Sequence, residues 1–330
     1  MPLSSNSAFG ALPMTLAINK IPATPTIIRG LGLFRQELLT ETYVRIARQN
    51  NMLELVPAVP RGAPGEPLSR ESRDMLIFDL LHLPENDVVL ADDVQNLRQF
   101  GSTSQPETVA SVVAARLARM KEKIELTREY HQLGALQGQI LNKDGSTVLL
   151  DIYQRFGLTR KEFGWDLGTA ATNVGKKIDE TITEMKRRYA GETISGWACL
   201  CSPEFMQALV YHKSIEPLYV RFQDGKTYRE GETNVEFIHK GIRFIQYDYD
   251  FGNGIKVKEN EAILLPLGTK STFVECFAPA NYSETVNTKA LPYYAKRVAM
   301  EFDKGWKLEA QSNPLPLVTR PELVATIKAA

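Results

Sequence analysis

The sequence has little of what metal centres, disulfide frameworks and membrane spans are built from. Four histidines and three cysteines in 330 residues are too few and too scattered for a disulfide scaffold or a zinc module. The 39 Lys and Arg equal the 39 Asp and Glu, so the zero net charge argues against nucleic-acid binding through a bulk basic excess. No apolar run approaches the ~20 residues of a membrane span, and no targeting signal opens the chain. We therefore expect a soluble, reduced, cytoplasmic chain without cofactor or membrane segment.

Proline is concentrated toward the start of the chain. Nine of the 18 prolines lie within residues 1–84, where their fixed φ and missing N–H oppose a packed helical domain. Residues 1–34 are therefore predicted to form an extended arm. Alternating apolar residues over 42–56 predict two strands joined by a turn, although a helix over 36–48 stays open. Residues 57–67 hold six Pro or Gly in eleven positions, so this stretch either extends into solvent or packs on another subunit.

The next part of the chain has a helical pattern. Residues 107–141 contain no proline, and their apolar side chains recur at helical spacing. We expect one helix here, about 50 Å long at 1.5 Å per residue. Its mixed charges imply a partly exposed spine, on which Gly134 and Gly138 mark close packing or a bend.

Residues 148–293 have the pattern of a separate α/β unit. A length of about 150 residues per domain makes a second domain the expectation for this chain. An apolar stripe over 171–189 predicts an amphipathic helix, and Ser202 followed by proline predicts the start of another. Strands follow, and residues 294–311 alternate on both sides of a turn at Asp303, which predicts a hairpin.

No group of residues has the spacing of a recognisable active site. The stretch from Gly168 to Lys177 has six residues between its glycines where a phosphate-binding loop needs four, so we interpret it as a helix start. Cys201 and His212 are close in sequence and leave a hydrolase as an alternative. We expect Cys199 to point away from Cys201, and we interpret all three thiols as small buried side chains.

Six segments follow one another in the order found in a known family. They are TLAINKIPATPTIIRGLGLF (15–34), VPAVPRGAPG (56–65), LADDVQNLRQFG (90–101), EYHQLGALQGQIL (129–141), DGSTVLLDIYQRFG (144–157) and FAPANYSETVNTKALPYYAKRVAMEFDKGWKLEAQSNPLPLVTRPELV (277–324). Together they resemble the major capsid protein of lambda-like tailed bacteriophages, the E-protein family. The resemblance runs from about residue 9 to residue 325 and is weakest over 160–262.

The resemblance implies an α+β fold of the Hong Kong 97 capsid type. The implied parts are an N-terminal arm (1–34), an extended-loop hairpin (35–84), a peripheral domain (85–147) with a spine helix (107–141), an axial domain (148–293) and a return to the peripheral domain (294–330). The implied function is that of a non-enzymatic major capsid protein. Its hexamers and pentamers would form the icosahedral shell around phage double-stranded DNA, without sequence specificity.

The resemblance also implies partners, locations and contacts. Portal and scaffolding proteins are expected partners, a decoration protein is an optional one, and the virion and the host cytoplasm are the expected locations. The Hong Kong 97 phage cross-links its shell through a Lys–Asn bond, but no matching Lys, Asn and catalytic Glu is identified here, so no cross-link is expected. We expect no catalytic, cofactor-binding or metal site. The candidate contacts between subunits are Arg61, Arg70 and Arg73 of one chain and Glu301 and Asp303 of its neighbour.

Three other functions stay open on the sequence alone. An encapsulin-like bacterial compartment would share the implied fold and enclose enzymes in place of DNA. A hydrolase using Cys201 and His212 would belong to a different class of protein. A nucleic-acid-binding module is suggested by residues 1–50, whose five Lys or Arg and two Glu give a net charge of +3, enough for weak contact only.

Overall fold

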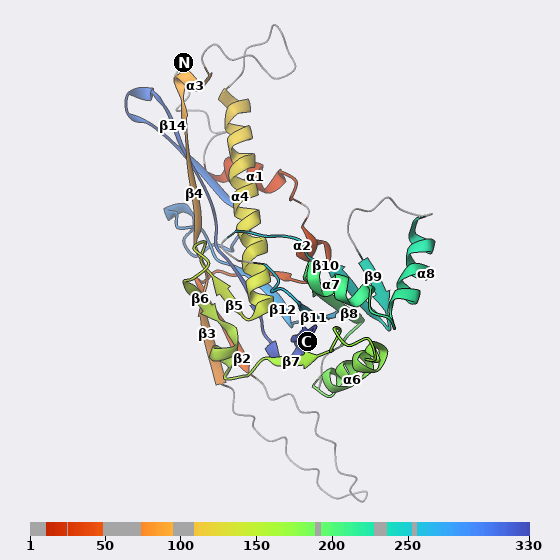
Figure 1. The fold of residues 1–330 in the computed structure, drawn as a ribbon. Coiled ribbons are helices and arrows are strands. Elements are labelled where there is room, and N and C mark those ends of the chain that lie inside the picture. Colours follow the sequence, from red (N-terminus) through yellow and green to blue (C-terminus); the bar gives the residue numbers. More distant parts are fainter. Residues whose placement is uncertain are drawn as a thin grey trace, which may run out of the picture. The chain divides into compact units, whose positions relative to one another are not determined.

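The computed structural model describes residues 11–24, 26–48, 74–94, 109–188, 193–227, 236–252 and 256–330. The chain divides into two compact units, and Figure 1 labels their helices and strands. Unit 1 comprises Met1–Val44, Phe78–Gln132 and Val274–Leu317, and unit 2 comprises Arg45–Ile77, Leu133–Phe273 and Val318–Ala330. An element that crosses a boundary belongs to the unit that holds most of its residues.

Unit 1 is built on two three-stranded sheets and one long helix. Its elements are α1 (Ala11–Lys20), α2 (Ile27–Gly30), β1 (Arg35–Leu38), β4 (Leu83–Leu90), α3 (Ala91–Val94), α4 (Val109–Gln137), β12 (Phe273–Phe277), η3 (Ser283–Thr285), β13 (Tyr294–Ala299), η4 (Glu301–Asp303), β14 (Gly305–Ser312) and β15 (Pro314–Val318). The antiparallel sheet has the order β13-β14-β4, and the other sheet has the order β1-β12-β15.

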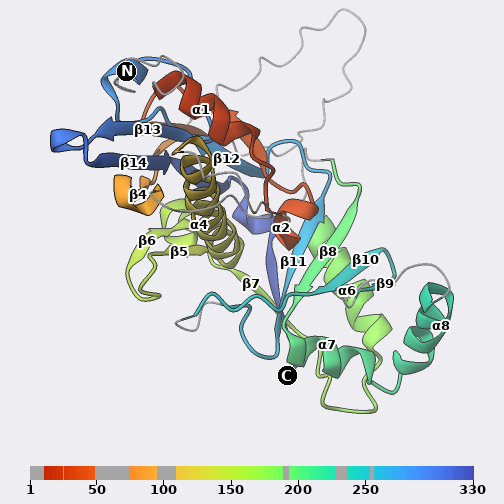
Figure 2. The same ribbon diagram turned by 90° about the horizontal axis from the view of Figure 1, so that it is seen from above.

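The core of unit 1 lies between α4, α1 and the β13-β14-β4 sheet. Apolar residues spaced three or four apart lie on one face of α4 because the helix has 3.6 residues per turn. Figure 2 shows α1 lying along β13, where Met14 and Ile18 of α1 join this core. The other buried members are Val89, Val113, Leu117, Met120, Ile124, Tyr293, Ala295, Leu308 and Ala310.

The prediction of an extended arm over residues 1–34 is wrong for the described part of this range, which contains the two helices α1 and α2. Pro13 lies in the first turn of α1, where a missing N–H breaks no helical hydrogen bond. Thr15 Oγ1 of α1 donates to the carbonyl oxygen of Ala295 at 3.3 Å, which ties the helix to β13. The alternative of a helix over 36–48 is wrong, because strand β1 covers 35–38 and strand β2 covers 43–48.

Unit 2 contains a mixed six-stranded sheet with the order β7-β16-β11-β8-β10-β9. Its elements are β2 (Tyr43–Arg48), β3 (Asp74–Asp79), β5 (Gln139–Leu141), β6 (Val148–Asp151), α5 (Ile152–Phe156), β7 (Lys161–Gly164), α6 (Val174–Lys186), β8 (Gly196–Cys201), α7 (Pro203–Val210), α8 (Glu216–Thr227), β9 (Glu236–His239), β10 (Ile242–Gln246), β11 (Glu261–Leu267), η5 (Pro321–Leu323) and β16 (Ala325–Lys328). Strands β2 and β3 pair with each other, as do β5 and β6.

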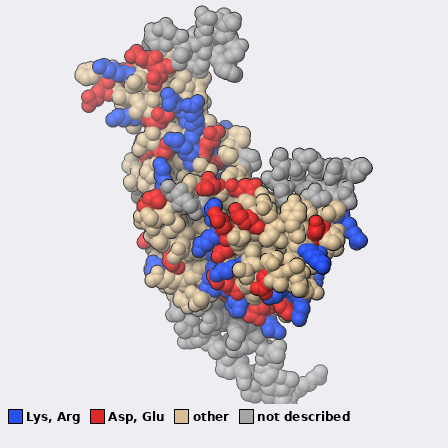
Figure 3. Space-filling model, in the orientation of Figure 1, with Lys and Arg blue, Asp and Glu red and all other residues tan. Residues whose placement is uncertain are grey.

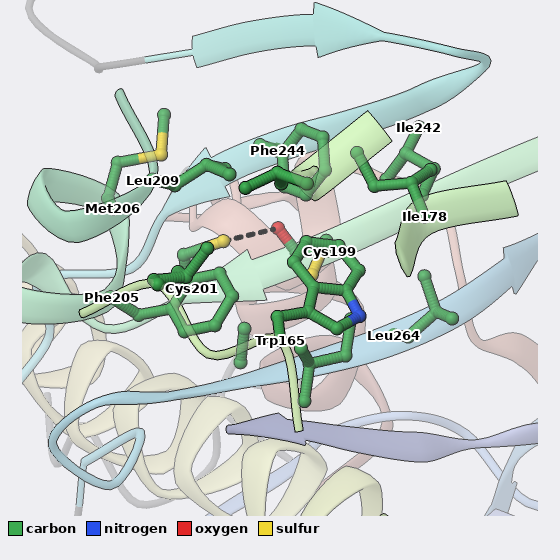
Figure 4. Packing of buried hydrophobic residues seen from close by; sticks show 14 of the residues in the cluster. Trp165, Ile178, Cys199, Cys201, Phe205, Met206, Leu209, Ile242, Phe244 and Leu264 are labelled. Atoms are coloured by element: carbon green, nitrogen blue, oxygen red, sulfur yellow. Dashed lines mark hydrogen bonds between the residues drawn. The ribbon is translucent and has the colours of Figure 1, made fainter. Parts of the chain in front are cut away.

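The core of unit 2 is centred on Trp165. Its indole N–H donates to Thr181 Oγ1 at 3.0 Å, and its ring lies 5.9 and 6.1 Å from the rings of Phe205 and Phe244. Figure 4 shows Cys199 and Cys201 together in this core, which corrects the expectation that they point apart. Residues two apart on a strand share a face, so both side chains of β8 point the same way.

Local sequence signals for helices in unit 2 are confirmed. Ser202 caps α7, because its Oγ accepts the N–H of Phe205 at 3.2 Å. The stretch ending at Lys177 is a helix start, and the side chain of Asn173 caps α6 by accepting the N–H of Lys176 at 3.0 Å. Within the described ranges, every helix is too short or too polar to traverse a bilayer.

Two boundaries differ from those expected for the spine helix and the chain end. The helix is described over 109–137, and it ends before the expected residue 141 because Gly138 adopts φ +96° and the chain continues as strand β5. The last residues, 318–330, were expected with the hairpin of 294–311. Their strand β16 pairs instead with β11 and β7, which places them in unit 2.

Gly134 lies where α4 meets the strand that follows it. A Cβ at this position would lie 2.7 Å from the carbonyl oxygen of Gln139 and 3.2 Å from Cα of Ile140. Both are backbone atoms, which cannot move aside as a flexible side chain can. The glycine therefore marks close packing, as expected.

We predict that Gly134→Ala lowers the free energy of unfolding by about 1–3 kcal/mol through overpacking. Helix propensity alone would give the opposite sign, because alanine is favoured over glycine by about 1 kcal/mol. Gly175→Ala in α6 is the matched control, since its Cβ would meet other atoms at 3.4 Å or more and should be neutral or slightly stabilising. Urea denaturation followed by tryptophan fluorescence measures both, and equal effects would contradict the packing argument.

Candidate functional site

The two carboxylates expected at a subunit contact lie at the tip of the β13–β14 hairpin. The strands pair from Tyr294 opposite Gln311 to Ala299 opposite Trp306. Beyond this pair, the N–H of Met300 donates to Gly305 O at 2.9 Å. Glu301 and Asp303 belong to η4 within this turn, which begins earlier than the turn predicted at Asp303.

Glu301 and Asp303 are available to a partner. Both are exposed. Among the described residues, neither carboxylate forms an ion pair. Figure 3 shows basic and acidic side chains interspersed over the visible face, including the end of the hairpin, without an extended patch of one sign. The hairpin tip therefore offers individual carboxylates and not a broad acidic field.

Phe302, between these two residues, has an unusual backbone. Its φ of 60° lies in the left-handed region, and Asp303 follows with a φ of 54°. A residue with a Cβ in this conformation costs about 1–2 kcal/mol relative to the right-handed one. The Phe302 side chain is nevertheless 89% exposed, and Lys304 Nζ lies 5.8 Å from its ring centroid. Packing within the described chain does not compensate this strain.

The outer face of the same sheet carries further exposed apolar side chains. Val298 of β13 and Val88 of β4 both lie opposite Lys307 of β14, so the three form one row across the sheet. Val88, Leu90 and Val298 are exposed, whereas the intervening Val89 is buried, as alternation along a strand requires. We call Val88, Leu90, Val298 and Phe302, with Glu301 and Asp303, the hairpin surface.

Sequence reasoning found only the two carboxylates of the hairpin surface. Arg61, Arg70 and Arg73, which were expected to meet them, lie outside the described residues. The sequence feature that could have identified Phe302 is its position in the predicted turn. Hairpin turns that require positive φ usually carry Asn, Asp or Gly, and an aromatic residue between two acidic ones is an exception.

The structure does not assemble the hydrolase alternative. Both ring nitrogens of His212 have structural partners, with Nδ1 2.9 Å from Ser214 Oγ and Nε2 3.1 Å from Thr169 O. The thiol of Cys201 donates to the carbonyl oxygen of Cys199 at 3.5 Å. Burial raises the pKa of Cys199 well above its usual value, so its thiolate is scarce near neutral pH.

The third cysteine and the acidic residues add no reactive centre. Burial, reinforced by the charges of Glu37 and Glu275, raises the pKa of Cys276 to about 12. Within the described part of the chain, no group of three or more His, Cys, Asp or Glu could hold a metal ion.

Comparison with known proteins identifies the family of the chain. A family model described as phage major capsid protein E matches residues 11–329. The major capsid protein of Salmonella phage Felix O1 is 24% identical, with 99% of this chain and 98% of that protein covered. The major capsid protein of Pseudomonas phage KPP10 is 26% identical, with 94% of each covered.

Two solved structures show the same fold. A putative prophage capsid protein from E. coli CFT073 matches with a TM-score of 0.60 and 12% identity, over 97% of this chain and 99% of that one. The mature capsid of bacteriophage PhiM1 matches with a TM-score of 0.51 and 15% identity, over 93% and 88%. The α+β fold of the Hong Kong 97 capsid type is thereby confirmed.

We predict that Phe302 is dispensable for folding. Phe302→Gly should leave the free energy of unfolding unchanged or raise it, because glycine adopts the left-handed region without strain. Phe302→Ala keeps the Cβ and is the matched control, expected to be less stable than the glycine variant by about 1 kcal/mol. Urea denaturation measures both. A loss above about 2 kcal/mol in each variant would mean that the ring supports the fold.

Proposed function

The chain belongs to the phage major capsid protein E family, and we propose that its hexamers and pentamers form the icosahedral head of a tailed phage around double-stranded DNA. It is a major capsid protein of the virion that associates with copies of itself in a shell. The observation that carries the proposal is the family match over residues 11–329, joined by relatives of full length that are named major capsid protein.

The finer parts of the proposal rest on the family. The family is one of structural proteins, and we propose that the chain has no catalytic activity of its own. Assembly would take place in the host cytoplasm, with portal and scaffolding proteins and optionally a decoration protein. The net charge of +3 over residues 1–50 is suited to weak, sequence-independent contact with enclosed DNA.

Electron microscopy of the purified chain tests the assembly. We predict hexamers, pentamers or closed shells, because obligate interfaces bury more than about 2,000 Å² and require partner surface. A folded monomer in sedimentation under all conditions, including added scaffold, would contradict this. Shells that contain protein cargo and no nucleic acid would favour the encapsulin-like alternative.

We propose that the hairpin surface receives the proline-rich loop of a neighbouring copy. Arg61, Arg70 and Arg73 of that loop would pair with Glu301 and Asp303, which are exposed and form no ion pair in the described chain. The exposed ring of Phe302 suits the same partner, because a guanidinium stacks on an aromatic face and gains about 0.5–1 kcal/mol at an exposed site. Charges at the edge of such a contact between subunits determine its specificity and its association rate more than its affinity.

We predict that reversing all three arginines to glutamate slows or blocks shell closure while leaving circular dichroism unchanged. Repulsion from the two carboxylates is the cause, so Glu301→Arg with Asp303→Asn on the same chain should restore closure. Asparagine is chosen because it tolerates the positive φ of residue 303. Light scattering at low and high salt follows closure, and salt should slow the wild type by screening. Wild-type rates for the triple variant at both salts would refute charge-mediated docking.

A further inference from the structure

Three charged side chains on α4 face residues 18–24 and 26–28 and not solvent. Lys121, Glu125 and Glu129 are spaced four apart, so they lie on one face of the helix. Their exposed fractions are only 3%, 2% and 2%. Lys121 Nζ donates to the carbonyl oxygens of Ile18 and Ile21, at 3.1 and 2.6 Å. The ammonium group thus binds the main chain at the end of α1.

The carboxylates of Glu125 and Glu129 bind the residues that follow α1 in the sequence. Glu125 Oε2 accepts the N–H of Thr24 at 2.6 Å. Glu129 accepts the Thr26 hydroxyl at 2.6 Å through Oε2 and the N–H of Ile28 at 3.1 Å through Oε1. The three side chains therefore hold four main-chain groups and one hydroxyl in sequence order. We call Lys121, Glu125 and Glu129 the arm clamp.

Surrounding groups favour the ionised form of Glu125 despite its burial. Burial raises the pKa of Glu125, but hydrogen bonds from Thr24 and Tyr293 with the charges of Arg29 and Lys121 outweigh it and leave the pKa below its usual value. Next to the clamp, Arg128 forms a buried ion pair with Glu275. Charged groups hydrogen-bond main chain more strongly than neutral ones, which suits recognition of a segment by its backbone.

We propose that the arm clamp is a peptide-binding site that takes a main-chain segment by its exposed carbonyl and N–H groups. It is filled here by the end of α1, residues 21–24 and the start of α2 of the same chain. Its ligand is defined by chemistry: two carbonyl oxygens, a hydroxyl and two amide N–H groups at fixed spacing. Every one of these contacts comes from α4 side chains, so binding does not require the covalent link through residues 30–34. The arm is thus a ligand held at high effective concentration.

A nicked chain tests the site directly. A specific protease site is inserted after Gly32, which is exposed and has open space around its α-carbon, and the folded full-length chain is cut there. The released arm should co-elute with the remainder in size-exclusion chromatography. After the change Glu125→Gln with Glu129→Gln, we expect it to separate, whereas Glu122→Gln, exposed on the same helix, should behave as the wild type.

Two outcomes overturn the proposal. An arm that dissociates from the nicked wild type, or that stays bound after the double change, would mean that no such site exists or that α1 alone holds the arm. Thr26→Val covers the case in which the double variant fails to fold, because it removes one hydroxyl contact and leaves α4 unchanged. It should weaken arm binding about three- to tenfold, the value of one hydrogen bond, and unchanged binding would count against the site.

Discussion

Unit 1 depends on one buried ion pair, between Arg128 of α4 and Glu275 of β12. The guanidinium donates through Nε at 3.0 Å and through Nη2 at 2.6 Å to the two carboxylate oxygens, and its carbon lies 4.9 Å from the Phe277 ring centroid. Removing one partner of such a pair leaves an uncompensated buried charge and typically costs about 3–5 kcal/mol. The pair joins a helix and a strand separated by 147 residues, so it holds the long helix against one sheet of the unit.

The same pair belongs to one cluster of charged groups with the neighbouring arm clamp. Counting the pair itself, this cluster holds three positive groups, from Lys121, Arg128 and Arg29, and three negative ones, from Glu125, Glu129 and Glu275. An unbalanced cluster at this depth would change protonation state, because isolated buried charges are strongly disfavoured. Tyr293 completes the network, since its hydroxyl donates to Glu125 at 2.9 Å. Balance within the cluster therefore lets charged side chains hold the arm from inside the unit.

The sequence predicted what depends on neighbouring residues and missed what depends on distant ones. The start of α7 at Ser202 and the β13–β14 hairpin follow from local caps and alternation, and both are confirmed. The charges of α4 were expected on an exposed surface, yet Lys121 and Glu125 are buried because their partners come from a segment about 100 residues earlier. The pairing of β16 with β11 and β7 is non-local in the same way, and no periodicity within residues 318–330 reveals it.

The hairpin surface differs from the core in that its strained and exposed groups are not compensated by the neighbouring side chains that the structure describes. In the core, central polar and charged groups are matched inside the same unit, as with Trp165 and Thr181 or Arg128 and Glu275. At the hairpin tip, Phe302 keeps a strained backbone and an exposed ring that no described neighbour compensates. Strain of this kind persists when it serves something other than the stability of the isolated chain. A subunit whose contacts are completed by its neighbours would place its uncompensated groups in this way, at the ends of hairpins and away from the buried pairs that fold it.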